Sequence, residues 1–312
     1  MKVCLAGEGA QGTTHMETLR RLGGVEVVTV AGGVETELAA FARAWDVPHY
    51  SLDLAECLRR PGVEAMILGS PNQVHCKQVE LALGMGKHVL VEIPMGLTLA
   101  EAERVVSMEE RTGLVCMVCH TQRYNPIFGE VRRRLREGEL TLHHVVHHTF
   151  FMRRRNENRL GKPRTWVDDL LWHQACHMVD LICWLLDDPH LAAWGQAGPP
   201  HPEMGVPMDL TIGLRSRDGC LVTSAHSFNH HGPIQGQYRF IGEQATLIAD
   251  KGRLIDHEGN ELRLPAGDAV LAQDAEFLAA VREGRPALTS CSACLPTMET
   301  LDRIQRAIDA RR

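Results

Sequence analysis

The sequence predicts an α/β protein, with an N-terminal Rossmann domain built on a doubly wound parallel sheet and a C-terminal α+β domain with a large, open-faced, mainly antiparallel sheet. A G-x-G-x-x-G motif, Gly7 to Gly12, directly follows a short apolar run. Apolar strand-like runs then alternate with helical patterns, which is typical of a parallel sheet covered on both faces. Beyond about residue 120, strand-like runs follow one another, which indicates an antiparallel sheet.

The elements of the first half are expected in strict alternation, and together they predict a dinucleotide-binding domain over residues 1–121. The expected strands cover residues 3–6, 25–31, 65–68, 88–91 and 114–118. The expected helices cover residues 10–22, 35–45, 73–83 and 99–111.

The second half predicts a substrate and oligomerisation domain over residues 122–312. Its expected strands cover residues 143–151, 209–214, 220–228 and 238–241. One strongly apolar helix is expected at about residues 166–186, and the chain returns to helix from about Asp268. We expect this C-terminal helix to pack back on the first domain.

Composition excludes several classes of protein. A formal net charge of -6 argues against non-specific binding of nucleic acid. No stretch of about 18 apolar residues indicates a membrane span, and the N-terminus lacks the apolar run of a secretion signal. The 10 cysteines are scattered in apolar surroundings and are expected to be reduced thiols of a cytoplasmic protein. We expect no bound metal.

The glycine motif predicts a dinucleotide site, because each glycine has its own physical reason. Gly7 permits a tight turn, Gly9 lets a pyrophosphate approach the backbone, and Gly12 allows close packing of helix on strand. Ala10 and Gln11 open the helix, whose N-terminus attracts the phosphates. The predicted cofactor is therefore NADP or NAD.

The choice between the two cofactors stays open at the sequence level. The second expected strand ends at Ala31 and is followed by Gly32 and Gly33. These positions hold neither an acid for the two ribose hydroxyls of NAD nor an arginine for the 2′-phosphate of NADP.

Three later segments add specificity. They are Ser70-Pro71-Asn72 with His75, Glu92-Ile93-Pro94, and the helix segment that contains His177. Their order, with the glycine loop, resembles the glucose–fructose oxidoreductase, inositol dehydrogenase and MocA family over nearly the whole chain. The resemblance implies an active site between the two domains and a homo-oligomer formed through the C-terminal sheet. It adds six residues to the cofactor site, beside Gly32 and Gly33: Ser70, Pro71, Asn72, His75, Glu92 and Pro94.

The chain departs from that family at two positions. Ile93 stands where the family has a lysine, and His173 stands where it has an aspartate. A narrower resemblance, to the semialdehyde dehydrogenases of this family, accounts for both departures. It covers segments 91–94, 113–118, 120–126, 150–156, 163–166 and 170–177. It implies oxidation of a carboxylated cyclic hemiacetal to a lactone in aromatic catabolism, with NADP as the usual acceptor.

The base for this oxidation must come from elsewhere, since Ile93 carries no proton. His173 and His177 are spaced i, i+4 and are expected on one helix face, where either could accept a proton. His177 aligns with the family histidine, so we expect it to be the base and His173 to orient the substrate. A metal site completed by Asp169 or Asp180 is the alternative reading of the same pair, and packed structural histidines are another.

A polycarboxylate substrate needs cationic partners, and arginine side chains bind carboxylates bidentately. Arg153 and Arg154 follow an expected strand, and Arg123 lies near the domain junction. The expected substrate-binding residues are Arg123, Asn125, Arg153, Arg154, Asn156, Arg164, Trp166 and Asn229.

The leading functional hypothesis is an NAD(P)-dependent dehydrogenase that oxidises the hemiacetal of 4-carboxy-2-hydroxymuconate-6-semialdehyde to 2-pyrone-4,6-dicarboxylate. Its expected partner is this small polycarboxylate, with no nucleic acid and no membrane. A related oxidoreductase acting on a sugar acid or an aromatic-derived acid is the second hypothesis. A non-catalytic sensor of NAD(P) is the third.

Overall fold

The structure is a computed structural model that describes residues 1–158, 161, 163–164, 166 and 168–310. By its internal contacts the chain divides into two compact units. Unit 1 comprises Met1–Thr121, Glu157–Trp166 and Asp268–Leu295. Unit 2 comprises Gln122–Asn156, Val167–Gly267 and Pro296–Arg312. Both units are therefore assembled from segments far apart in the sequence.

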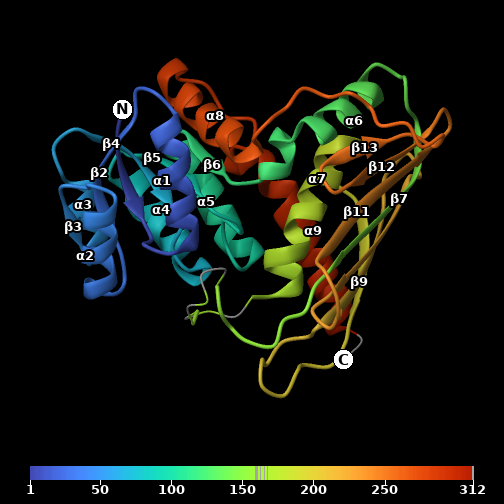
Figure 1. Cartoon of the computed structure of the whole chain (residues 1–312), viewed down its shortest axis with the longest axis horizontal. Coiled ribbons are helices and arrows are strands. Elements are labelled where there is room, and N and C mark those ends of the chain that lie inside the picture. Colours follow the sequence, from blue (N-terminus) through green and yellow to red (C-terminus); the bar gives the residue numbers. More distant parts are fainter. Residues whose placement is uncertain (159–160, 162, 165, 167, 311–312) are drawn as a thin grey trace. The chain divides into compact units, whose positions relative to one another are not determined.

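Unit 1 contains a six-stranded sheet in the order β3-β2-β1-β4-β5-β6, with all the neighbouring strands parallel (Figure 1). This is the strand order of a doubly wound dinucleotide-binding fold, as the alternating pattern predicts. The strands are β1 (Lys2–Ala6), β2 (Glu26–Ala31), β3 (Tyr50–Ser51), β4 (Val63–Leu68), β5 (His88–Val91) and β6 (Cys116–Val118).

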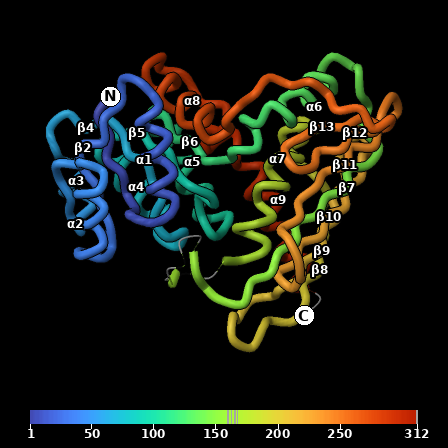
Figure 2. Tube along the Cα trace, viewed as in Figure 1, coloured from blue at the N-terminus to red at the C-terminus, as the bar shows by residue number. Residues whose placement is uncertain are grey.

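Helices connect these strands and cover the sheet. They are α1 (Ala10–Arg21), α2 (Glu35–Ala44), α3 (Leu54–Leu58), α4 (His75–Gly84), α5 (Leu99–Thr112) and α8 (Ala269–Glu283), with the start of α9 (Cys291–Asp309). Within unit 1, α8 lies beside α1, as the Cα trace also shows (Figure 2). A late segment of the chain thus completes the first domain.

Unit 2 contains a seven-stranded sheet in the order β13-β12-β11-β7-β10-β9-β8. Its neighbours are antiparallel except for β7 and β10, which pair in parallel. The predicted mainly antiparallel sheet is confirmed. Its strands are β7 (Leu142–Phe150), β8 (Ala192–Ala197), β9 (Asp209–Arg215), β10 (Leu221–Ser227), β11 (Gln235–Gly242), β12 (Thr246–Asp250) and β13 (Arg253–Ile255). Sequence periodicity missed the short strands β3, β8, β12 and β13.

The apolar helix of unit 2 differs from its prediction. It begins at Leu170 and not at residue 166, because the Asp169 side chain accepts hydrogen bonds from the backbone N–H groups of Leu171 and Trp172 and so caps the helix there. Its first turns, η3 (Leu170–Ala175), are a π-helix, and the α-helix α7 (Cys176–Leu186) follows. Helix α6 (Pro126–Arg136) packs beside α7. None of the helices in the described part of the chain is long and apolar enough to cross a lipid bilayer.

Candidate active site

The glycine loop between β1 and α1 has the geometry that a dinucleotide needs. Gly7 has a φ of +114°, which favours glycine, and its N–H donates to the carbonyl of Ala31 at 2.8 Å. A Cβ on Gly12 would collide with the carbonyl oxygen of Gly7. A Cβ on Gly9, in contrast, would meet no atom within 4 Å. The space above Gly9 can therefore receive a pyrophosphate, and the first N–H groups of α1 can bind it.

The residues predicted at the ends of β4 and β5 come together. One ring nitrogen of His75 donates to the Pro94 carbonyl at 2.8 Å, and the other lies 2.8 Å from the Ser70 carbonyl. Asn72 lies between Ser70 and His75 in the sequence. Its side chain is buried, and it begins a short 3₁₀ turn. These contacts fix the two loops at the carboxyl edge of the sheet, where ligands of doubly wound folds bind.

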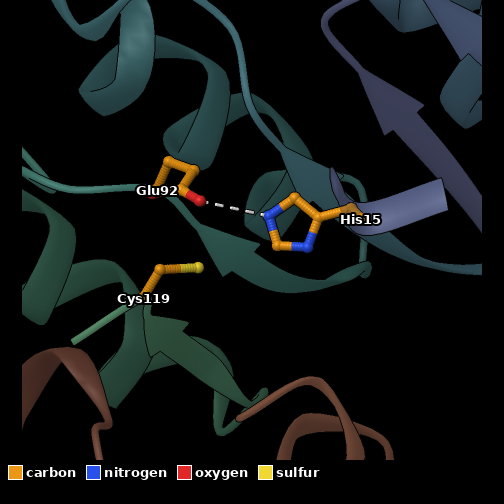
Figure 3. A group of neighbouring side chains, drawn as sticks. All are labelled: His15, Glu92 and Cys119. Carbon is orange, nitrogen blue, oxygen red and sulfur yellow. Dashed lines mark ion pairs between the residues drawn. The ribbon is translucent and has the colours of Figure 1, made fainter. Parts of the chain in front are cut away.

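Glu92, at the end of β5, belongs to a network that sequence analysis did not foresee (Figure 3). Its Oε1 accepts a hydrogen bond from Nε2 of Gln11 at 2.8 Å and lies 3.3 Å from Nε2 of His15. The other ring nitrogen of His15, Nδ1, is 2.9 Å from a carboxylate oxygen of Asp274 on α8. Glu92 therefore links the glycine loop to α1 and α8.

The charges in this network compensate one another. Burial by itself would lower the pKa of the His15 imidazole, but the charge and hydrogen bond of Asp274 outweigh it, and the pKa lies well above its ordinary value. Burial would likewise raise the pKa of Glu92, but His15 outweighs it and holds that pKa below the usual range. The network is thus an imidazolium between two carboxylates, which keeps Glu92 ionised and in place.

Cys119 lies beside the same network, and its sulfur, His15 and Glu92 approach within 4.8 Å of one another (Figure 3). Such spacing would suit a metal ion. However, burial raises the pKa of the Cys119 thiol, so the sulfur stays protonated. A protonated His15 ring also has no lone pair to offer. The charge pattern therefore favours an ion-paired network, and we assign no metal here.

In unit 2, His173 has a fully buried carboxylate partner. Its Nδ1 lies 2.6 Å from Oδ1 of Asp168, and the Gln174 amide donates to both carboxylate oxygens of Asp168 at 2.9 and 3.0 Å. The Arg153 guanidinium forms an ion pair with the other oxygen. Burial opposes ionisation of Asp168, but His173 and Arg153 outweigh it and hold the pKa of this carboxyl well below its usual range.

This pairing sets the chemistry of the His173 ring. A carboxylate at Nδ1 fixes the tautomer that carries its proton there. The ring is partly exposed, with 21% of its side-chain surface accessible, whereas Asp168 is at 0%. His177 lies on α7 and is half-buried. The π turn separates the two histidines, so the helical spacing of 3.6 residues does not describe their relative direction.

The predicted arginines have different surroundings. Arg154 is exposed, and it donates to the carbonyls of Arg153 and Phe228 and to the Asn229 side chain at 2.7 Å. Asn229 in turn donates to Asp209 at 2.5 Å. The Arg164 guanidinium, in unit 1, lies over the Trp166 ring at 4.8 Å. Arg154 is therefore held in an extended position at the surface of unit 2 by a chain of polar contacts.

Two other predicted substrate contacts have structural partners. Arg123 is buried and binds the Asp180 carboxylate through Nε at 2.9 Å and a terminal nitrogen at 2.6 Å. Asp180 also accepts a hydrogen bond from Thr297 at 3.0 Å. The Asn125 side chain caps α6 by accepting the Ile127 N–H at 2.9 Å. Both side chains therefore have partners within unit 2, and their role in substrate binding stays a prediction. Asn156 also belongs to unit 2.

Sequence analysis missed Asp168 and Asp274. Asp168 precedes the helix cap, Asp169, by one residue. Its place five residues before His173 marks it as a partner of that histidine only when the first turn is known to be a π-helix. Asp274 left no such signal, because its partner His15 is 259 residues away.

Comparisons with known proteins agree with this fold. Residues 1–120 match the model of an oxidoreductase family with an NAD-binding Rossmann fold, and residues 126–267 match that of bacterial oxidoreductases, C-terminal. The chain is 37% identical over 309 residues to a 4-carboxy-2-hydroxymuconate-6-semialdehyde dehydrogenase from Sphingobium sp., with 98% of each chain covered. It is 28% identical to a scyllo-inositol 2-dehydrogenase (NAD(+)) from Bacillus subtilis, over 45% of this chain and 41% of that protein.

Solved structures show the same fold at low identity. An oxidoreductase from Agrobacterium radiobacter, in complex with NAD+, L-tartaric acid and magnesium, superposes with a TM-score of 0.88 at 16% identity, over 100% of this chain and 97% of that one. A UDP-N-acetylglucosamine 3-dehydrogenase from Acidithiobacillus ferrooxidans gives 0.86 at 18%, over 99% and 98%.

A Rossmann sheet with an intact glycine cradle, followed by a mainly antiparallel domain with a paired histidine, defines a nicotinamide-dependent oxidoreductase. The chain belongs to the glucose–fructose oxidoreductase, inositol dehydrogenase and MocA family. It is a dehydrogenase that acts on CH–OH groups with a nicotinamide dinucleotide, as the sequence predicts.

Proposed function

We propose that this dehydrogenase oxidises a carboxylated cyclic hemiacetal to a lactone, and that its substrate is the hemiacetal of 4-carboxy-2-hydroxymuconate-6-semialdehyde. The product would be 2-pyrone-4,6-dicarboxylate. Two observations support the proposal. The relative with that name is 37% identical over almost the whole chain. The family lysine is absent, at Ile93, and a histidine with a buried carboxylate partner is present instead.

The observation that carries the mechanism is the contact between Asp168 and His173. Oxidation of a hemiacetal removes a hydride from carbon and a proton from the hydroxyl oxygen, and a C=O bond forms. The oxidised nicotinamide, when bound, accepts the hydride. The hydroxyl proton passes to the His173 imidazole, while Asp168 holds Nδ1 and stabilises the charged ring. This assignment reverses the preference of the sequence analysis, in which His177 was the expected base.

Arg154 supplies the recognition of a carboxylate in this proposal. Its guanidinium has five N–H donors, and it is held by Asn229 and a backbone carbonyl at the end of β10. Arg153 has a different role, because it ion-pairs with Asp168 and so fixes the orientation of the base. His177 would contact the substrate hydroxyl as a second polar group.

The test is steady-state turnover with a panel of substrates. The purified protein is mixed with the hemiacetal, with analogues that lack one carboxylate, and with inositol and sugar acids, each with NAD and with NADP. The proposal expects formation of the reduced nicotinamide and of the pyrone with the dicarboxylated hemiacetal, and much lower kcat/KM with the others. Comparable rates with sugar acids would favour the broader family activity. No turnover with any substrate, despite dinucleotide binding, would favour a sensor.

A further inference from the structure

The adenosine end of the dinucleotide site contains an acid that the strand itself lacks. In doubly wound folds the residue that reads the adenosine ribose follows the second strand. Here β2 ends at Ala31, and two glycines follow. In the structure the side chain of Glu8, from the middle of the glycine loop, reaches across to this turn. Its Oε1 accepts hydrogen bonds from the N–H groups of Gly33 at 3.0 Å and Val34 at 3.1 Å.

The Glu8 carboxylate takes up the space of a missing side chain. A Cβ on Gly32 would come within 2.7 Å of the Glu8 Cδ and would collide with its Oε2. The residue after β2 can therefore be only glycine while Glu8 stays in this position. Glu8 and Gly32 therefore depend on each other. In other doubly wound folds an acid follows the second strand, whereas here the loop after β1 supplies it.

The same carboxylate occupies an anion-binding position. The N–H groups of Gly33 and Val34 lie at the start of α2, where Val34 is the N-cap and has no side-chain capping bond of its own. Such N–H groups and the helix dipole favour an anion. A 2′-phosphate on the ribose would use these donors, but here Glu8 already accepts from both of them.

The charges of the neighbouring residues also disfavour a 2′-phosphate. Glu35 and Glu37 lie in the first turn of α2, and residues 32–42 contain neither lysine nor arginine. The segment that follows β2 thus adds two acidic residues and no cation beside Glu8. The two ribose hydroxyls of NAD, in contrast, are donors that a carboxylate accepts well.

We propose that Glu8 determines cofactor choice: it accepts hydrogen bonds from the adenosine ribose and excludes the 2′-phosphate, so that the protein selects NAD over NADP. The inference depends on the dinucleotide site of unit 1 and not on the proposed substrate. It closes the choice that the sequence left open.

The experiment measures binding directly, with NADH and NADPH as probes and calorimetry as the readout, so that no substrate is needed. The wild type is expected to bind NADH at least about 100-fold more tightly than NADPH, because like charges brought together cost several kcal/mol. Glu8→Gln keeps an oxygen that can accept from Gly33 and Val34, so the fold should persist. We expect this variant to bind NADPH at least about 10-fold more tightly than the wild type does, and NADH a few-fold more weakly.

Two further variants sharpen the test. Glu35→Gln removes a neighbouring charge without touching the Gly33 and Val34 donors, and it should change the ratio less than Glu8→Gln does. Gly33→Arg adds a cation where a Cβ would meet no atom within 4 Å. Combined with Glu8→Gln, it should invert the preference.

Equal affinities of the wild type for NADH and NADPH would overturn the inference, and so would an unchanged ratio in Glu8→Gln. Loss of binding of both probes by the wild type would overturn the dinucleotide site on which it depends. Selective NADH binding without turnover of any hemiacetal would contradict the proposed substrate and would support the role of Glu8.

Discussion

Asp168 and His173 form a carboxylate–imidazole pair at 2.6 Å in which the acid is completely buried and the ring is partly exposed. The pair is local, since the two residues are five positions apart, and the π turn η3 brings them together. Arg153 and Gln174 complete the surroundings of the carboxylate. This arrangement is the basis of the proposal that His173 is the catalytic base.

The first prediction concerns this base. His173→Asn removes the group that accepts the proton, so kcat should fall by about 10²–10⁴-fold. Asp168→Asn should also lower kcat, because the amide no longer fixes the tautomer. Steady-state kinetics measures both effects.

His177→Asn is the matched control for the same measurement. It should lose less activity than His173→Asn. If the larger loss of kcat falls on His177→Asn, the base is His177 and the Asp168–His173 pair only positions the substrate.

The second prediction separates two glycines of one loop. Gly9→Val adds a side chain in open space, so the free energy of unfolding should change by less than about 0.5 kcal/mol, while dinucleotide binding is lost. Gly12→Ala places a methyl group against the Gly7 carbonyl, so it should destabilise the fold by about 1–3 kcal/mol. Chemical denaturation and calorimetry measure the two properties. Dinucleotide affinity that survives in Gly9→Val would show that the loop is only a turn.

The third prediction concerns the carboxylate of the substrate. Arg154→Met removes a charge-assisted contact. The kcat/KM for the dicarboxylate should therefore fall, mainly through KM, by an amount that corresponds to a loss of about 1.5–3 kcal/mol of binding free energy. The loss should shrink with an analogue that lacks one carboxylate. Arg134→Met is the control, because Arg134 pairs with Glu130 on α6 and has no proposed contact with substrate. Equal effects of the two variants would remove Arg154 from the site.

Arg153→Met should behave differently from Arg154→Met. Arg153 pairs with Asp168, so its loss should act on kcat through the orientation of His173.

The fourth prediction concerns stability against acid. His226 on β10 and His147 on β7 are both buried and both bond to Ser224, at 2.9 and 2.8 Å. Burial lowers the pKa of His226 to about 4, and burial with the charge of His226 lowers that of His147. An unfolded histidine has a pKa near 6.5, so between about pH 4 and 6.5 the unfolded chain binds more protons than the folded one.

Stability should therefore be complete above about pH 6.5 and should fall as the pH drops toward 4. His226 alone should account for a loss of about 2 kcal/mol between about pH 7.5 and 5. His226→Gln removes this proton uptake, so its stability should depend less steeply on pH. Urea denaturation of both proteins at the two pH values measures the difference. The same loss in both proteins would assign the acid sensitivity to other groups.

The sequence predicts well what depends on local rules. The glycine loop combines a turn, an open approach and a close packing contact within six residues, and the structure has all three at Gly7, Gly9 and Gly12. The alternation of apolar strands with helices also predicts the first sheet, because a buried parallel strand is apolar throughout its length.

Partners distant in the sequence explain what could not be predicted. Arg123 stays a predicted substrate contact, and its ion pair could not be foreseen because the carboxylate partner, Asp180, lies 57 residues later. Glu8 occupies a variable position of the glycine motif, so no sequence signal marks it. Only the fold brings its side chain to Gly33. His173 and His177 were expected on one helix face from their i, i+4 spacing, and a π turn changes that spacing.

The interleaved composition of the two units has a consequence for how the chain is made. Unit 1 begins with the first residue and is completed by Asp268–Leu295, whose Asp274 neutralises the buried His15. Unit 2 is in turn completed by the last turns of α9. During synthesis the nascent chain therefore cannot close its first domain before most of the second has emerged from the ribosome. Native packing of unit 1 is therefore a late event, because it needs residues 268–295.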